Sequence, residues 1–179
     1  MAIQILNHLL AKIQSVFADK PADDAQNSLE SLKTISKCLS DMSADQASLF
    51  AAFAFILHRV AYADNCVTPD ESIKIKTILM RWGAMTEAQA KLVSQIAAVQ
   101  NQLKGGTDNY LVSREFKETA TGEQKSNLLR CLFAVAASDD LISALESDTV
   151  RMISKELGFS HREFIEIRRD FVDKLAALK

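Results

Sequence analysis

The chain has 179 residues and a net charge of −2, and its composition of 48% hydrophobic and 25% charged residues is that of an ordinary globular domain. This composition excludes wholesale disorder, and the small net charge provides no field to attract nucleic acid or an anionic membrane surface. Because five glycines and two prolines are too few for a fold with many turns, we expect a single all-α domain.

Three helices are predicted in the first third of the chain. Apolar residues recur at helical spacing in residues 3–17 and again in residues 29–39. Residues 1–43 are therefore expected to form an N-terminal helical extension packed on the bundle. A third helix, predicted for residues 43–63, opens with the Ser-x-x-Gln pattern of a capping box. It is apolar nearly all round, which places it at the centre of the bundle.

A shift of 75 residues superimposes two parts of the sequence. Residues 57–83 and 132–158 share eight identities in 27 positions without a gap. The identical pairs are Leu57/Leu132, Val60/Val135, Ala61/Ala136, Asp64/Asp139, Glu71/Glu146, Ser72/Ser147, Ile78/Ile153 and Gly83/Gly158. Each repeat is predicted to contain a buried helix, a short acidic turn, an amphipathic helix that ends before glycine, and a further helix.

The repeats predict the domain organisation. Residues 44–179 are expected to form one helical bundle, with repeats at about 44–103 and 122–179 related by pseudo-twofold symmetry. With the N-terminal extension, the fold should have about 7–9 helices. The segment between the repeats, residues 104–122, contains three of the five glycines and is predicted to be a loop with a short helix around residues 112–119.

The acidic turn of each repeat has a structural interpretation. Thr68-Pro-Asp-Glu71 and Ser143-Ala-Leu-Glu146 are both capping boxes, in which the first and fourth side chains bond backbone N–H groups at the start of a helix. Asn65 and Asp140 suit such a turn because both residue types tolerate the left-handed backbone. On this interpretation, Glu71 and Glu146 bond the starts of their own helices.

The same turns also suggest a metal site. Asp64 and Glu71 in the first turn, with Asp139 and Glu146 in the second, form two equivalent pairs of carboxylates. If the symmetry brings the turns together, these four residues could bind a divalent cation, Ca²⁺ or Mg²⁺, since both prefer oxygen ligands. The spacing is not that of an EF-hand. The capping box does not require Asp64 or its counterpart Asp139, so these two are the first candidates for a function.

A family resemblance rests on these residues. The turns Ala61-Tyr-Ala-Asp-Asn-Cys-Val-Thr-Pro-Asp-Glu71 and Ala136-Ala-Ser-Asp-Asp-Leu-Ile-Ser-Ala-Leu-Glu146, each followed by Ile-x-x-x-x-Gly, resemble the tellurite-resistance TerB-like family. The chain is also similar to the N-terminal domain of a membrane-anchored DnaJ-like co-chaperone. The resemblance covers roughly residues 44–172. Family members typically have glycine after the aspartate, where this chain has Asn65 and Asp140.

The resemblance implies a bacterial, cytoplasmic, all-α protein of the response to tellurium oxyanions and other stresses. Acidic surface residues of the family have been suggested to bind metal, and here they correspond to Asp64, Glu71, Asp139 and Glu146. We therefore expect a non-enzymatic protein that acts by binding a protein partner, a metal ion or both. The alternatives are a metal-dependent enzyme that uses the four carboxylates and a purely structural oligomer, such as a homodimer. No catalytic residues and no organic cofactor are predicted.

The remaining candidates have structural interpretations. Three cysteines without a CxxC pair indicate reduced thiols in a cytoplasmic compartment, and we expect Cys66 and Cys131 to be buried. His58 and Trp82 align with Phe133 and Leu157, so both are predicted to be packed side chains. A last helix over residues 160–179 should pack an apolar face on the core. The first residues have no basic leader, so we expect no signal peptide, and no apolar run is long enough to span a bilayer.

Overall fold

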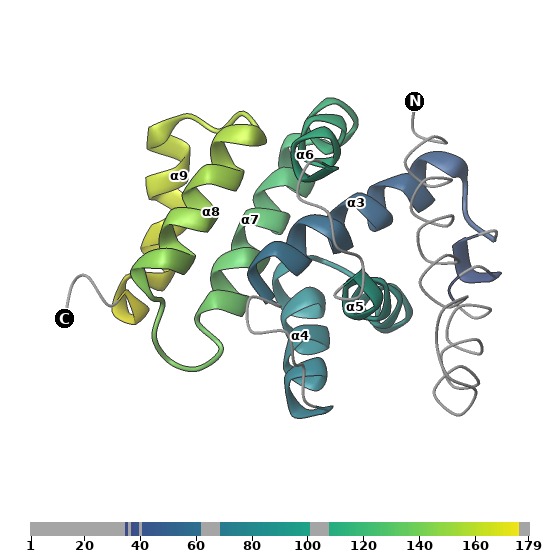
Figure 1. Ribbon diagram of the computed structural model, residues 1–179, viewed down its shortest axis with the longest axis horizontal. Coiled ribbons are helices and arrows are strands. Elements are labelled where there is room, and N and C mark those ends of the chain that lie inside the picture. Colours follow the sequence, from purple (N-terminus) through teal and green to yellow (C-terminus); the bar gives the residue numbers. More distant parts are fainter. Residues whose placement is uncertain (1–34, 36, 40, 62–68, 101–107, 176–179) are drawn as a thin grey trace.

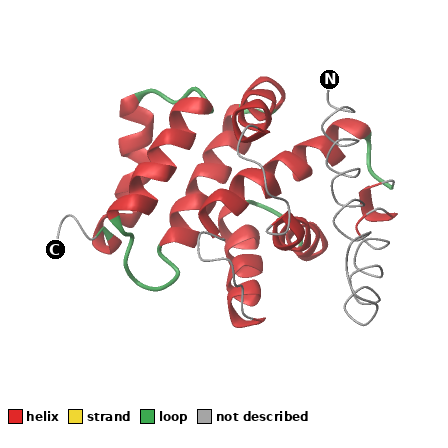
Figure 2. Ribbon diagram, viewed as in Figure 1, coloured by secondary structure: helices red, strands yellow, loops and turns green. Residues whose placement is uncertain are grey.

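The computed structural model describes residues 35, 37–39, 41–61, 69–100 and 108–175 of the chain. Within these ranges the fold consists of seven α-helices, one 3-10 helix and connecting loops, with no strand (Figures 1 and 2). The elements are α3 (Ala44–Ala61), α4 (Pro69–Trp82), α5 (Glu87–Gln100), α6 (Asp108–Thr119), α7 (Gly122–Ala136), α8 (Ala144–Glu156), α9 (His161–Arg168) and η1 (Arg169–Lys174). The predicted all-α bundle is confirmed.

Two helices form the centre of the bundle. α3 packs against α5, α6, α7 and α8, and α7 packs against α3, α4, α8 and α9 (Figure 1). Their core positions are alanines and large aliphatic or aromatic residues, and Leu57, Leu132 and Phe133 are fully buried. One hydrophobic core runs through both predicted repeats. The central place predicted for the helix around residues 43–63 is therefore correct.

The helix boundaries follow the repeat in the sequence. α3 and α7 end at Ala61 and Ala136, and α4 and α8 begin at Pro69 and Ala144, so each pair of boundaries lies 75 residues apart. Whether a twofold axis relates the repeats remains a prediction. The predicted N-terminal helices fall almost entirely on residues 1–34, outside the described part of the chain, although Ile35 and Leu39 belong to the core.

Capping boxes start most of the later helices. The Ser143–Glu146 and Ser160–Glu163 boxes are present at α8 and α9, with both reciprocal hydrogen bonds formed. Thr86 and Gln89 make the same exchange at α5. A further box, Thr121–Gln124, starts α7 immediately after α6, so the segment predicted as a loop is largely helical in its described part. The Thr-x-x-Gln pattern at Thr121 was the signal for it in the sequence.

The C-terminal part of the chain differs from the single helix predicted for residues 160–179. The α-helix ends at Arg168, continues as 3-10 helix η1 to Lys174, and becomes extended at Leu175. The backbone N–H of Ile142 donates a hydrogen bond of 2.7 Å to the carbonyl oxygen of Lys174. This bond and the stacking of Phe171 on Phe133 draw the backbone out of the α-helical path.

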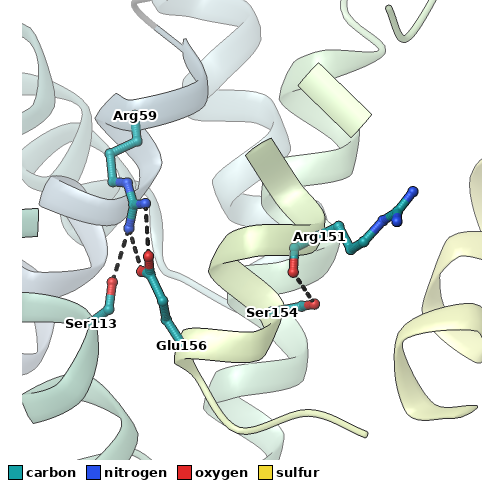
Figure 3. A network of polar contacts seen from close by, with 5 residues as sticks. All are labelled: Arg59, Ser113, Arg151, Ser154 and Glu156. Carbon is teal, nitrogen blue, oxygen red and sulfur yellow. Dashed lines mark hydrogen bonds and ion pairs between the residues drawn. The ribbon is translucent and has the colours of Figure 1, made fainter. Parts of the chain in front are cut away.

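An ion pair in the interior joins helices that are far apart in the sequence. Arg59 of α3 donates to both carboxylate oxygens of Glu156 in α8, at 2.6 and 3.1 Å, and to the Ser113 hydroxyl of α6 at 3.0 Å (Figure 3). The two charged side chains are only 9% and 15% exposed. Burial opposes ionisation of Glu156, but the hydrogen bonds from Arg59 and Ser113 and the Arg59 charge outweigh it, so its pKa is lowered.

His58 is a partly buried histidine on α3, next to Arg59 in sequence. Burial lowers the pKa of its imidazole, and a backbone hydrogen bond with Ala97 of α5 opposes this shift. The neutral form is therefore the one that the folded protein favours. This environment agrees with the packed histidine that its alignment with Phe133 predicted.

Removing one partner of the Arg59–Glu156 pair is expected to destabilise the fold. Arg59→Met leaves the Glu156 carboxylate buried without its cation, and breaking such a pair costs about 3–5 kcal/mol. The double variant Arg59→Met/Glu156→Leu should lose less stability, because neither charge then remains buried. Urea unfolding followed by fluorescence of Trp82, the single tryptophan, measures both.

Arg162→Met is the matched control for this experiment. Arg162 forms an exposed ion pair with Glu166, in which the side chains are 89% and 54% exposed. Its loss should change the free energy of unfolding by no more than about 0.5 kcal/mol. Equal losses for Arg59→Met and Arg162→Met would contradict a dominant role for the interior pair.

His58 is expected to make the protein less stable as the pH falls below about 6.5, the ordinary pKa of histidine. Because the folded-state pKa is lowered, the unfolded chain binds this proton more readily, and the free energy of unfolding falls as the pH drops through this value. His58→Phe should remove this part of the pH dependence, since phenylalanine does not titrate. Unfolding curves at a series of pH values test it, and an unchanged slope in the variant would refute it.

Candidate functional site

The structure describes two of the four predicted metal ligands in full, Asp139 and Glu146. Asp64 lies outside the described residues, and Glu71 lies in α4 but its side chain is not described. Asp139 and Glu146 belong to the described turn between α7 and α8 and to the first turn of α8. The convergence of all four carboxylates therefore stays a prediction, and the second turn carries the observations.

Glu146 caps its own helix. Its Oε2 atom accepts hydrogen bonds from the Ser143 backbone N–H at 2.9 Å and from the Ser143 hydroxyl at 2.7 Å. The Ser143 Oγ atom in turn accepts a hydrogen bond from the Glu146 backbone N–H at 3.2 Å. These bonds satisfy N–H groups that have no partner within the helix. The capping interpretation of the second turn is confirmed.

The turn that precedes the cap is fixed at several points. Asp140 has a left-handed backbone with φ of 74°, as predicted, and its N–H bonds the Ala137 carbonyl oxygen. The Asp140 carboxylate also forms an ion pair with Lys174. Ile142 is buried in the core, with its N–H on the Lys174 carbonyl oxygen. The turn is therefore a defined structure rather than a loose connection.

Asp139 is the acidic residue of this turn that has no such role. Its side chain is exposed, and no hydrogen bond or ion pair joins it to a residue that the structure describes. Asp139 instead lines a surface groove of about 420 Å³ between α4 and α8, which we call the α4–α8 groove. Its lining residues are Val60, Ala61, Lys74, Ile75, Val135, Ser138, Asp139, Leu141, Ser143, Leu145 and Glu146.

The α4–α8 groove lies where both central helices end. Val60 and Ala61 are the last residues of α3, and Val135 is near the end of α7. The first acidic turn begins directly after Ala61, and the second forms one rim of the groove. The connection between α7 and α8 lies at the edge of the molecule (Figure 1). The fold thus brings the α3 end and the second turn to one surface site.

The groove is more apolar than the sequence indicated. Six of its lining residues are aliphatic, and two of them are conspicuously exposed, Leu141 at 41% and Leu145 at 76%. The Leu145 side chain stands on the first turn of α8, between the two residues of the capping box. The repeat alignment drew attention to the carboxylates, and the only signal for Leu145 was an apolar residue in a polar turn.

The described part of the groove is poorly suited to hold a metal ion by itself. No group of three or more His, Cys, Asp or Glu side chains with metal-binding geometry occurs among the described residues. Glu146 uses one oxygen in its cap, so Asp139 is the one wholly uncommitted carboxylate that the groove displays there. Ca²⁺ and Mg²⁺ take about six or more oxygen ligands, so a cation here would need Asp64 and Glu71 as well.

A second surface pocket, of about 440 Å³, lies between the start of α3 and the junction of α6 and α7. Most of its polar lining groups already have partners. Thr121 and Gln124 form the α7 capping box, and the Thr119 hydroxyl bonds the Glu115 carbonyl oxygen. Thr119, Thr121 and Gln124 therefore have few free polar groups to offer a ligand.

The other sequence candidates are structural. Cys131 is fully buried as predicted, and burial raises the pKa of its thiol far above the ordinary value, which excludes a reactive thiolate. Cys66 lies outside the described residues. Trp82 is half-buried against the core, with its ring 5.4 Å from that of Phe171 and the Arg81 guanidinium 5.3 Å above it. Neither Cys131 nor Trp82 lines the α4–α8 groove.

The comparisons with known proteins agree with the resemblance in the sequence. The family model described as "Tellurite resistance protein TerB" matches residues 50–169, well over half of the chain. No curated protein and no solved structure matches the chain significantly, and the similarity to the DnaJ-like co-chaperone stays a prediction. None of the described helices is both long and apolar enough to cross a bilayer. The chain belongs to the TerB family of tellurite-resistance proteins.

Proposed function

We propose that this chain is a non-enzymatic, cytoplasmic protein of the tellurite stress response that acts by binding a protein partner in the α4–α8 groove. The observation that carries the proposal is the exposure of Leu141 and Leu145 beside the uncommitted Asp139 on one preformed surface. Apolar side chains exposed at a concave site are typical of interaction surfaces. Membership of the TerB family supplies the connection to tellurite.

The chemistry of the groove favours binding over catalysis. A metal-dependent enzyme would need carboxylates that are free to hold the ion, and Glu146 is engaged by Ser143. Cys131, a fully buried thiol, is unable to serve as a nucleophile for oxyanion chemistry at the surface. Binding through complementary shape requires only the apolar walls and the charges that the groove presents.

Survival on potassium tellurite tests the proposed function. Expression of the chain in a tellurite-sensitive bacterial host should raise survival, and Leu141→Glu/Leu145→Glu should abolish the effect, because two charges would then line the apolar walls. Met152→Glu, which changes another exposed residue of α8 outside the groove, should retain full protection. Absence of protection by the wild type, or full protection by the folded groove variant, would exclude the proposal.

Binding of a divalent cation is a second candidate function, favoured by the uncommitted carboxylate of Asp139 in the groove. Calorimetric titration with Ca²⁺, Mg²⁺ and Zn²⁺ should then give a heat that disappears in Asp64→Ala/Asp139→Ala, since these two positions have no part in the caps. Glu146→Gln keeps the Ser143 cap, because its amide oxygen can still accept those bonds, and it removes only the charge. A smaller heat in this variant would show that the Glu146 carboxylate takes part in binding the cation. No heat with any ion on the wild type would remove the cation from consideration.

A further inference from the structure

The walls of the α4–α8 groove define what kind of surface would fill it. Val60, Ile75 and Val135 form part of its apolar lining from three different helices, and all three are buried or nearly so. Leu141 and Leu145 rise from this lining on the α8 side and are open to solvent. A ligand that covers these two side chains must itself present apolar groups, because polar groups placed there would lose their bonds to water.

The charges of the groove are unevenly distributed. Residues 137–148, which form the α8 side, contain four acidic residues and no lysine or arginine. Asp140 and Asp148 are already paired, with Lys174 and Arg151 respectively. Asp139 and the Oε1 atom of Glu146 have no partner among the described residues, so this rim carries negative charge, while the one cation of the groove lining, Lys74, lies on the α4 side. A cationic group would complement it.

The shape of the site indicates a helix as the occupant. The lining comes from α4, from the ends of α3 and α7, and from the α7–α8 turn with the first turn of α8. The described residues offer no unpaired strand edge to which an extended peptide could add, since the Ile142–Leu175 bridge is already formed. Recognition in a groove between helices typically uses an amphipathic helix whose apolar residues recur every three or four positions. Such a helix can present aliphatic and charged side chains on adjacent stripes.

We propose that the partner is an amphipathic helix of another protein, with an aliphatic stripe that packs on Leu141 and Leu145 and a flanking lysine or arginine that pairs with Asp139. This inference rests on the proposed function, because it names the partner class of the same groove. The negative rim disfavours an anionic membrane surface. A second copy of this chain would offer this rim, from the same groove, only Lys74 as a cation, and sedimentation equilibrium below tests that occupant.

A set of three synthetic peptides tests the inference. Each has about 18 residues, or roughly five helical turns, and an identical leucine stripe, flanked by lysine, glutamate or glutamine. Fluorescence anisotropy of the labelled peptides should show binding that decreases from the lysine to the glutamine to the glutamate peptide. Leu145→Glu should weaken binding of the lysine peptide by about tenfold or more, as for a central interface residue.

Charge reversal and a matched control sharpen the experiment. Asp139→Lys should weaken the lysine peptide and strengthen the glutamate peptide, whereas Met152→Glu, on the same helix but outside the groove, should change neither. The melting temperature of each variant reports folding, and Leu145→Ala replaces Leu145→Glu if the latter unfolds. Equal binding of all three peptides, no binding of any, or equal losses in Met152→Glu and Leu145→Glu would overturn the proposal.

Two further measurements separate the other occupants. A dimer in sedimentation equilibrium that Leu145→Glu dissociates, or flotation with anionic vesicles that the same variant abolishes, would assign the groove to a second copy or to a membrane and overturn the partner helix. If groove variants lose tellurite survival while no peptide binds, the helix is wrong and the proposed function stands. If every groove variant protects fully, the proposed function itself fails.

Discussion

The packing of α3 on α7 determines where the α7–α8 turn, with its acidic residues, lies on the surface. About half of the residues of each helix are buried, and each helix packs against four others. The last residues of α3 and α7 line the same groove, so both central helices end at one place on the surface. Residues at that place are positioned by the core itself and need no flexible loop to bring them together.

The Arg59–Glu156 ion pair adds a constraint that the repeat does not contain. In the alignment of the repeats, Arg59 corresponds to Ala134 and Glu156 to Arg81, so no second copy of the pair exists in the sequence. The pair holds the C-terminal end of α8 to α3 and, through Ser113, to α6 (Figure 3). The Ser143 cap and the Ile142–Lys174 bond hold the other end. The α8 wall of the groove is thus fixed at both ends, which lowers the entropic cost of binding there.

Local features of the fold could be predicted from the sequence, and long-range ones could not. The capping boxes at Ser143 and Ser160 and the left-handed Asp140 depend on residues within four positions of one another, and the structure confirms them. The Arg59–Glu156 pair joins residues 97 positions apart, which no periodicity indicates. The 3-10 end of the chain depends on a bond to Ile142 of a distant turn. Helical periodicity also gives the faces of α8 but not which of them a neighbour covers, so the exposure of Leu145 was missed.

The structural and functional interpretations of the acidic turn are compatible. Glu146 closes the capping box on Ser143, and the same box fixes the first turn of α8, on which Leu145 stands exposed. The left-handed Asp140 similarly fixes the turn that carries Asp139. The cap therefore builds the rim of the groove, and Asp139 and Leu145, which have no capping role, are exposed on it. In the repeat alignment Leu145 corresponds to Asp70, so the two turns have different chemistry at this position. A cation bound between equivalent carboxylates would not need an apolar residue in one turn and an acidic residue in the other. The proposed amphipathic helix would pack its apolar stripe on Leu145 and pair its charged stripe with Asp139.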